Sequence, residues 1–154
     1  MPSMAIIRDF LAQKRIAVVG VSHDPKDFSR GLLRTLRERG YDAVAVNPEL
    51  ESADDAPCFA RLDEIKPPVD GVLVMTSPAV TDQVVQDCAK LRIPRVWMYR
   101  AGGKGAVSPQ AIEYCEEHGI AVVPGECPYM FLSHEHWFHR LHGFIKRISG
   151  SYPA

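Results

Sequence analysis

The sequence predicts an α/β fold, a doubly wound, five-stranded parallel sheet with helices on both faces. Short apolar segments alternate with helical patterns along the chain, and such alternation requires parallel strands joined by right-handed helical crossovers. The stretch 15–39 reads as the first half of a βαβ unit, with an apolar strand at 16–19, a turn at Gly20 and then a helix. A strand that is apolar on both faces and leads into a helix is typical of parallel sheets.

The other elements follow the same alternation. Residues 4–13 have the spacing of an amphipathic helix, which we expect to lie across the sheet edge. Residues 49–57 are acidic with little apolar content, and they read as a surface loop. The remaining expected strands are 43–46, 69–75, 95–99 and 120–123, and the remaining expected helices are 60–65, 79–91, 108–118 and 135–148.

Length and composition narrow the class of protein. A chain of 154 residues fits one domain, 1–154, that can bury its own core. The net charge of -1, without a long basic run, argues against binding to nucleic acid or to a membrane surface. No stretch has the pattern of a signal peptide or a membrane span, and four cysteines without regular spacing indicate neither zinc nor a disulfide framework. We therefore expect a cytoplasmic protein.

The turn at Gly20 is the first candidate for a binding site. It follows a buried strand, and open α/β sheets bind ligands at the carboxyl ends of their strands. Glycine allows close approach to the backbone, and the start of the next helix offers unpaired N–H groups and a positive dipole end. These features favour a ligand that carries phosphate groups. The structural alternative is a tight turn that binds nothing.

Two common nucleotide motifs do not fit. The dinucleotide fingerprint G-x-G-x-x-G fails because no second glycine stands two places after Gly20. At the end of the second strand, Asn47 and Pro48 replace the acid that would bind a ribose hydroxyl of NAD, and an amide would not repel a phosphorylated ribose. The Walker A motif fails because Gly105 follows Lys104 where Ser or Thr is needed.

Five segments together resemble a known family. They are IAVVGVS, GYDAVAVNP, PVDGVLVMTSP, VWMYRAGG and AVVPGECPYM, in this order within about residues 5–148. They look like the small single-domain CoA-binding proteins, whose fold is similar to the N-terminal domain of the succinyl-CoA synthetase alpha subunit. The resemblance implies a Rossmann-like fold that binds coenzyme A across the carboxyl ends of the strands, without a second domain and usually without demonstrated catalysis.

The resemblance also implies which residues line the ligand. The first turn would line the CoA nucleotide, two cations beyond it would meet the phosphates, and the ends of the second and third strands would complete the site. The family commonly has a glutamine soon after the tryptophan of the fourth strand. Here Met98-Tyr99-Arg100 leads into a longer glycine loop, so Arg100 and Lys104 are candidate contacts to phosphate or substrate. The other matching positions are Gly20, Val21, Ser22, Lys26, Arg30, Asn47, Pro48, Thr76, Ser77 and Pro78.

Each matching position also has a purely structural interpretation. Lys26 and Arg30 are of a type that is common on exposed helix surfaces. Asn47-Pro48 could simply end a strand. Residues 76–78 could cap the next helix through a hydroxyl of Thr76 or Ser77, a role that is compatible with lining a site.

The C-terminal part carries residues that invite other chemistry. His134, His136, His139 and His142 are potential metal ligands, but their spacing does not enforce zinc geometry and nearby aromatic residues indicate packing, so we expect no metal site. Cys127 follows the fifth strand, where a thiol nucleophile or a mixed disulfide with CoA is conceivable. No neighbouring base is evident, so we expect a buried, inert cysteine and no catalytic residue.

The leading hypothesis is therefore a stand-alone, non-catalytic module that binds CoA or a short acyl-CoA. The nucleotide would lie over the first two strand ends, and the pantetheine would extend toward residues 102–105. The alternative is an enzyme, either an NADP-linked reductase or an acyl-CoA-transferring enzyme that uses Cys127 or a histidine and acts with a partner. The sequence leaves open a homo-oligomer or an unknown protein partner.

Overall fold

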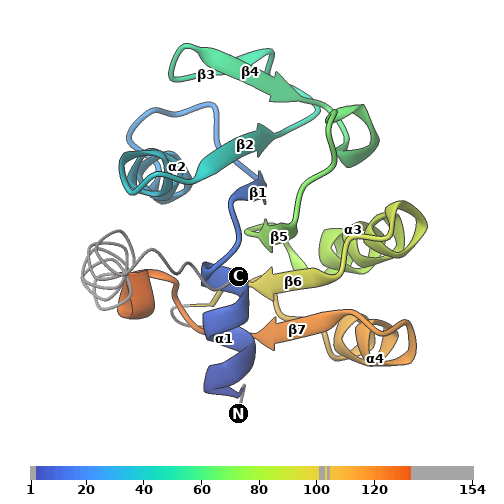
Figure 1. The fold of residues 1–154 in the computed structure, drawn as a ribbon. Coiled ribbons are helices and arrows are strands. Elements are labelled where there is room, and N and C mark those ends of the chain that lie inside the picture. Colours follow the sequence, from blue (N-terminus) through green and yellow to red (C-terminus); the bar gives the residue numbers. More distant parts are fainter. Residues whose placement is uncertain (1–2, 101–102, 104, 133–154) are drawn as a thin grey trace.

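The computed structural model of the chain describes residues 3–100, 103 and 105–132 (Figure 1). The expected helix at 135–148 lies outside them. Within the described residues, a seven-stranded sheet has the order β3-β4-β2-β1-β5-β6-β7. Its strands are β1 (Arg15–Val19), β2 (Asp42–Val46), β3 (Ser52–Ala53), β4 (Ala56–Phe59), β5 (Gly71–Val74), β6 (Arg95–Met98) and β7 (Ala121–Pro124). The helices are α1 (Met4–Leu11), α2 (Phe28–Glu38), the 3₁₀ helix η1 (Leu62–Glu64), α3 (Pro78–Leu91) and α4 (Pro109–Glu117).

The α/β prediction is confirmed, but the prediction of five strands is wrong because the sheet has seven. The five expected strands are present as β1, β2, β5, β6 and β7, all paired in parallel. The other two form a hairpin where the acidic composition predicts a surface loop: β4 pairs in parallel with β2, and β3 pairs antiparallel with β4. In this hairpin Ala53 and Cys58 are the buried residues of the two strands, so its apolar pattern is too sparse to predict a strand.

The additional strand β4 completes a characteristic order. Counted along the chain, the six parallel strands lie in the order 3-2-1-4-5-6, which is that of doubly wound dinucleotide-binding sheets. The order reverses between β1 and β5, and such sheets bind ligands outside the carboxyl ends of the strands at that point. The fold therefore brings the loops that follow β1 and β5 to the place where a ligand is expected.

Alternate residues of the central strand β1 face two separate cores. Ile16 and Val18 pack with α1 and α2, whereas Ala17 and Val19 pack with α3 and α4. In Figure 1, α2 lies to the left of the sheet, and α3 and α4 lie to its right. All four side chains are buried, which explains why β1 is a continuous apolar run rather than an alternating one.

Helix α1 packs on the same side of the sheet as α2. The ring of Phe10 meets that of Trp97 in a T-shaped contact with 5.4 Å between centroids. A Cβ at Gly71, the first residue of β5, would lie 2.9 Å from Cε2 of Phe10. The helix also contacts β7, the edge strand of the sheet, so it lies over the strands from β5 to the edge at β7.

Two smaller observations complete the comparison with the expected elements. The helix expected at 60–65 is the single 3₁₀ turn of η1. None of the helices in the described ranges combines the length and hydropathy that a bilayer crossing demands.

Candidate functional site

Gly20 brings the loop after β1 against the loop after β5. Its φ of +99° is a conformation that favours glycine. A Cβ at this position would lie 3.0 Å from Cγ2 of Thr76 and 3.1 Å from the carbonyl carbon of Met75. Two residues predicted for the site, Gly20 and Thr76, therefore meet at the point where the strand order reverses. This approach within the chain already requires glycine, with or without a ligand.

Side chains from two other elements hold the carbonyl groups of the loop after β1. Asn47, which follows β2, donates from Nδ2 to the Val21 oxygen at 2.7 Å. Arg30, in the first turn of α2, donates from Nη1 to the oxygens of Ser22 at 3.3 Å and His23 at 3.4 Å. Within 20–27, the amide groups of Val21 and His23 are the ones without an acceptor among the described residues, proline aside. They are the free donors of this loop.

The start of α2 already holds an anion that belongs to the chain. Asp27 occupies the N-cap position, and its Oδ2 accepts hydrogen bonds from the Ser29 amide at 2.9 Å and the Ser29 hydroxyl at 2.6 Å. The Ser29 hydroxyl in turn accepts from the Ser22 amide at 2.8 Å. The two hydrogen bonds from Ser29 lower the pKa of Asp27. The sequence predicts an anion site at this helix start, but the anion beside it is Asp27.

The start of α3 is different, because no side chain of the described residues caps it. Ser77 occupies the N-cap position and is exposed, and its side chain makes no capping hydrogen bond. Pro78 follows it and has no N–H to satisfy. Thr81 donates its hydroxyl to the Ser77 carbonyl at 3.1 Å and lies 3.3 Å from the hydroxyl of Thr76. Ser77 therefore takes the cap position predicted for it, while the hydroxyls of Thr76 and Ser77 leave the first-turn amides open.

The other predicted residues of this region have contrasting surroundings. Lys26 is exposed, and its ammonium group makes no hydrogen bond or ion pair with the rest of the described chain. Arg30 is 6% exposed, and its guanidinium is engaged within the protein. Asn47 accepts from the Glu49 amide at 2.8 Å as well as holding the first loop, and Pro48 beside it is exposed. Direct contact of any of these residues with a phosphate stays a prediction.

An aromatic group and a cation lie at the end of β6. Phe28 is 44% exposed although it stands at an apolar position of α2, and its ring is 5.3 Å from those of Tyr99 and Tyr129. Burial raises the pKa of the Tyr99 phenol. Arg100 is exposed, and its Nη2 lies 3.3 Å from where a Cβ of Gly125 would be. In the described part of the chain the Arg100 guanidinium has no hydrogen-bonding partner, so it is free to meet a ligand. Lys104 lies outside the described residues.

Neither the cysteines nor the potential metal-binding side chains form a second candidate site within the described ranges. No three His, Cys, Asp or Glu side chains of these ranges lie together as a metal site would require, and the four C-terminal histidines fall outside them. Burial raises the pKa of the Cys115 thiol to about 12 and also raises that of Cys88, which suits inert core residues. Cys127 is a free thiol and is half-buried, more accessible than the buried cysteine expected.

Comparison with known proteins identifies the family. A sequence model of the family described as "CoA binding domain" matches residues 14–133. The chain belongs to this CoA-binding family. The match spans the loops after β1, β2 and β5, and it confirms the resemblance that the sequence motifs indicate.

Individual proteins resemble this chain in sequence or in fold. The CoA-binding domain is 30% identical over 127 residues to the uncharacterized protein YneT of Bacillus subtilis (strain 168), covering 82% of this chain and 91% of that protein. It is 22% identical over 120 residues to the ADP-forming acetate–CoA ligase I of Archaeoglobus fulgidus, covering 74% of this chain but 18% of the ligase. A solved hypothetical protein from Pyrococcus horikoshii OT3 shares the fold with a TM-score of 0.79 and 24% identity, over 87% of this chain and 95% of that one.

Two acidic residues of the CoA-binding domain escaped prediction. Asp27 has a local signal, since an Asp just before a helical pattern is a standard N-cap. Asp54, in the turn of the β3–β4 hairpin, has no such local signal. Its Oδ1 accepts a hydrogen bond at 3.0 Å from Nη2 of Arg30, which lies 24 residues earlier in the chain. The hydrogen bond and charge of Arg30 lower the pKa of Asp54. This pair occupies an arginine that the sequence assigns to the ligand.

Proposed function

We propose that this protein binds coenzyme A or a short acyl-CoA as a stand-alone, non-catalytic module, with the whole chain, 1–154, as a single domain. Membership of the CoA-binding family carries the proposal. Two features of the site support it, the free amides of the loop after β1 and the uncapped start of α3. Both lie where doubly wound sheets accept nucleotides, and both favour a ligand with negative charge.

The proposed pose follows from the charges at the strand ends. The adenosine part lies over the ends of β1 and β2, where Asn47 offers an amide instead of the carboxylate that would repel a phosphorylated ribose. The phosphates lie near the Val21 and His23 amides and the start of α3, away from the Asp27 carboxylate. The full set of proposed contacts is Gly20, Val21, Ser22, Lys26, Asn47, Pro48, Thr76, Ser77, Pro78 and Arg100, with Arg30 nearby.

The pantetheine arm extends in the other direction, toward β6. On that side Phe28 supplies an exposed aromatic ring against the half-buried Tyr99. Arg100 supplies a cation beside it that is unpaired among the described residues. We further propose that the protein works in the cytoplasm on this small-molecule ligand, without nucleic acid or membrane. The net charge of -1 agrees with that proposal.

Titration calorimetry of the full chain tests the proposal. We expect CoA to bind and NADPH to give no heat and no change in fluorescence, because the glycine fingerprint for a dinucleotide is missing. Dephospho-CoA, which lacks the ribose phosphate, distinguishes recognition of that group from recognition of the diphosphate. The absence of CoA binding at about millimolar ligand, an affinity worth about 4 kcal/mol, would refute the proposal, and binding of NADPH in its place would favour a reductase.

A second candidate is a CoA-binding subunit of an acyl-CoA-forming or acyl-CoA-transferring enzyme. The similarity to an ADP-forming acetate–CoA ligase favours it, since this chain corresponds to 18% of that protein. Mass spectrometry of the native protein, purified without denaturant, separates the two candidates. A co-purifying second chain would support the enzyme, and a lone chain carrying CoA would support the binding module.

A further inference from the structure

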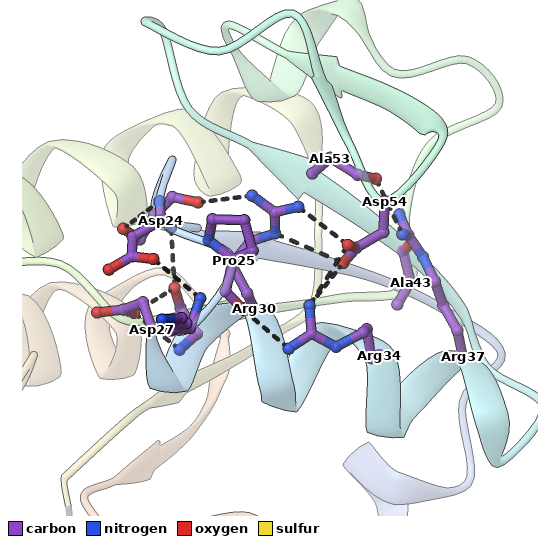
Figure 2. Close-up of polar contacts among 12 residues, drawn as sticks. Asp24, Pro25, Asp27, Arg30, Arg34, Arg37, Ala43, Ala53 and Asp54 are labelled. Atoms are coloured by element: carbon purple, nitrogen blue, oxygen red, sulfur yellow. Dashed lines mark hydrogen bonds and ion pairs between the residues drawn. The ribbon is translucent and has the colours of Figure 1, made fainter.

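Arginines of α2 converge on the β3–β4 hairpin (Figure 2). Arg30, Arg34 and Arg37 are four and three residues apart, a spacing that places them on one side of the helix. Arg34 donates from Nη1 to both carboxylate oxygens of Asp54 at 3.3 Å. Arg37 donates from Nη1 to the carbonyl of Ala53 at 3.3 Å. The turn of the hairpin is therefore fastened to α2.

Arg30 joins this turn to the loop after β1. On one side its Nε and Nη2 donate to the two oxygens of Asp54, at 3.5 Å and 3.0 Å. On the other side its Nη1 donates to the carbonyls of Ser22 and His23. Arg34 repeats the pattern, because its Nη2 donates to the carbonyl of Pro25 at 3.0 Å. Two guanidinium groups thus connect one carboxylate to three carbonyl groups of the same loop.

These contacts decide which way the loop amides point. In a planar trans peptide the C=O and the N–H of the next residue point in opposite directions. The Ser22 carbonyl points inward to Arg30, so the His23 amide points away from Arg30. That amide is one of the two donors of the loop that have no acceptor among the described residues. The orientation of a donor proposed to face the ligand therefore depends on the position of Arg30.

We infer that Asp54 is a positioning residue for the loop after β1, which is proposed to bind CoA. Its carboxylate holds Arg30, and Arg30 binds the loop carbonyl groups in the orientation that points the His23 amide outward. The inference rests on the proposed CoA site and assigns a role in it to the hairpin. Without the carboxylate, Arg30 would be a buried cation lacking its counter-charge, and such a cation moves toward water. The loop would then lose the donors that fix its carbonyl groups.

A purely electrostatic role of Asp54 and a positioning role predict opposite changes in CoA affinity when its charge is removed, which makes the inference testable. Asp54→Asn removes a negative charge near a site for a polyanion, so an electrostatic role alone predicts tighter CoA binding. Positioning predicts weaker binding. Asp55→Asn is the matched control, because it removes the same charge from the next position of the turn, and Asp55 is exposed and makes no ion pair within the described ranges. Asn tolerates the left-handed φ of 53° and 63° that these two residues adopt.

The first measurement is CoA affinity by calorimetry. We expect Asp54→Asn to raise the Kd about tenfold, in line with the loss of a hydrogen bond to a charged group. Asp55→Asn should leave the Kd unchanged or slightly lower it. Because positioning does not act through the field of the carboxylate, the difference should persist when added salt screens surface charges. Equal affinities of the two variants, or tighter binding by Asp54→Asn, would overturn the inference.

The second measurement needs no ligand and separates this inference from the proposed function. Amide signals of residues 22–24 are followed by NMR, together with hydrogen exchange of the Ser22 amide, which donates a hydrogen bond to the Ser29 hydroxyl. Asp54→Asn should shift all three signals and speed that exchange about tenfold, whereas Asp55→Asn should affect residues near the turn. Unchanged signals at 22–24 would refute positioning even if CoA binds.

A third protein covers the case in which Asp54→Asn does not fold. Arg30→Lys retains the charge beside Asp54, but a single ammonium cannot reach the carboxylate and two carbonyl groups in the fork geometry of a guanidinium. We expect the same shifts at residues 22–24. If the wild-type chain binds no CoA while these shifts occur, the proposed function fails and the positioning of the loop stands.

Discussion

Helices α2 and α3 begin after neighbouring strands of the sheet, yet their first turns have opposite chemistry. Asp27 caps α2 through two hydrogen bonds from Ser29, so that a negative charge lies at its positive end. Ser77 stands at the same position of α3 and makes no capping bond with its side chain. Within the described residues, the chain caps the start of α2 and leaves the start of α3 open to an anion.

This difference shows that topology locates a binding region without choosing the anion site within it. Both helix starts lie at the reversal of strand order, and their backbones offer the same dipole. The cap residue decides between them, because a carboxylate at the N-cap both takes the amides and repels a second anion. The phosphates of a ligand are therefore expected nearer α3 than α2.

Disrupting the contact between the loop after β1 and the loop after β5 should have the largest effect on stability. Gly20→Ala places a Cβ about 3 Å from Thr76 and Met75 in a backbone with φ of +99°. Left-handed strain and overpacking together should lower the free energy of unfolding by about 2 to 4 kcal/mol. Urea denaturation measures the change.

Gly40→Ala is the control for that substitution. Gly40 has a similar φ of +93°, but a Cβ there would have no atom of the described residues within 4 Å. It should cost the strain alone, about 1 to 2 kcal/mol. Equal losses in the two variants would show that the contact of Gly20 with Thr76 is unimportant and that the two loops are not held together there.

Placing a carboxylate at the N-cap of α3 should have the next largest effect. It should stabilise the fold and at the same time weaken CoA binding. Ser77→Asp supplies the missing cap to α3, which should stabilise the folded chain by up to about 1 kcal/mol. The same carboxylate would repel the CoA phosphates, so we expect the Kd measured by calorimetry to rise about tenfold. Few substitutions at a merely structural position would raise stability and weaken binding together.

Asp27→Asn provides the comparison at the other helix. The amide oxygen can still accept from Ser29, and the negative charge is gone. If phosphates bind at α3, the Kd for CoA should change by no more than about twofold, as is usual for one exposed charge. Markedly tighter binding by Asp27→Asn, combined with no effect of Ser77→Asp, would place the anion at α2 instead.

The sequence predicted the repeated strand–helix pattern because burial on both faces leaves continuous apolar runs. It missed the β3–β4 hairpin because backbone pairing with β2 creates that edge, and Ala53 and Cys58 are too few to form a pattern. Gly20, Asn47 and Thr76 were singled out from the sequence as a group, and in the structure they meet or hold the same loop. Their contact with a ligand stays a prediction. A glycine or a strand-ending Asn-Pro marks a strand end in the sequence itself.

Arg30 shows what local sequence cannot supply. An arginine in the first turn of a helix near a predicted phosphate site fits a ligand contact and an internal ion pair equally well. The choice depends on Asp54, whose approach requires the hairpin that the sequence did not predict. Charge pairing across a tertiary contact has no spacing rule comparable to that of a helix, and the role of such a residue becomes visible with the fold.

The smallest effect we predict is a pH dependence that isolates the cap of α2. Hydrogen bonds from Ser29 hold the pKa of Asp27 below its ordinary value of 3.8. The ionised carboxylate therefore stabilises the folded chain above that pH, and the contribution is lost as the pH falls through the lower pKa of the folded state. Asp27→Asn keeps an acceptor for Ser29 but cannot titrate, and Asp54, whose pKa is also lowered, is present in both proteins. The stability advantage of the wild type over Asp27→Asn, followed by thermal unfolding from about pH 6 to about pH 2, should therefore shrink toward the acid end. An advantage that stays constant across this range would mean that the charge of Asp27 does not cap α2, and the contrast between the two helix starts would then rest on Ser77 alone.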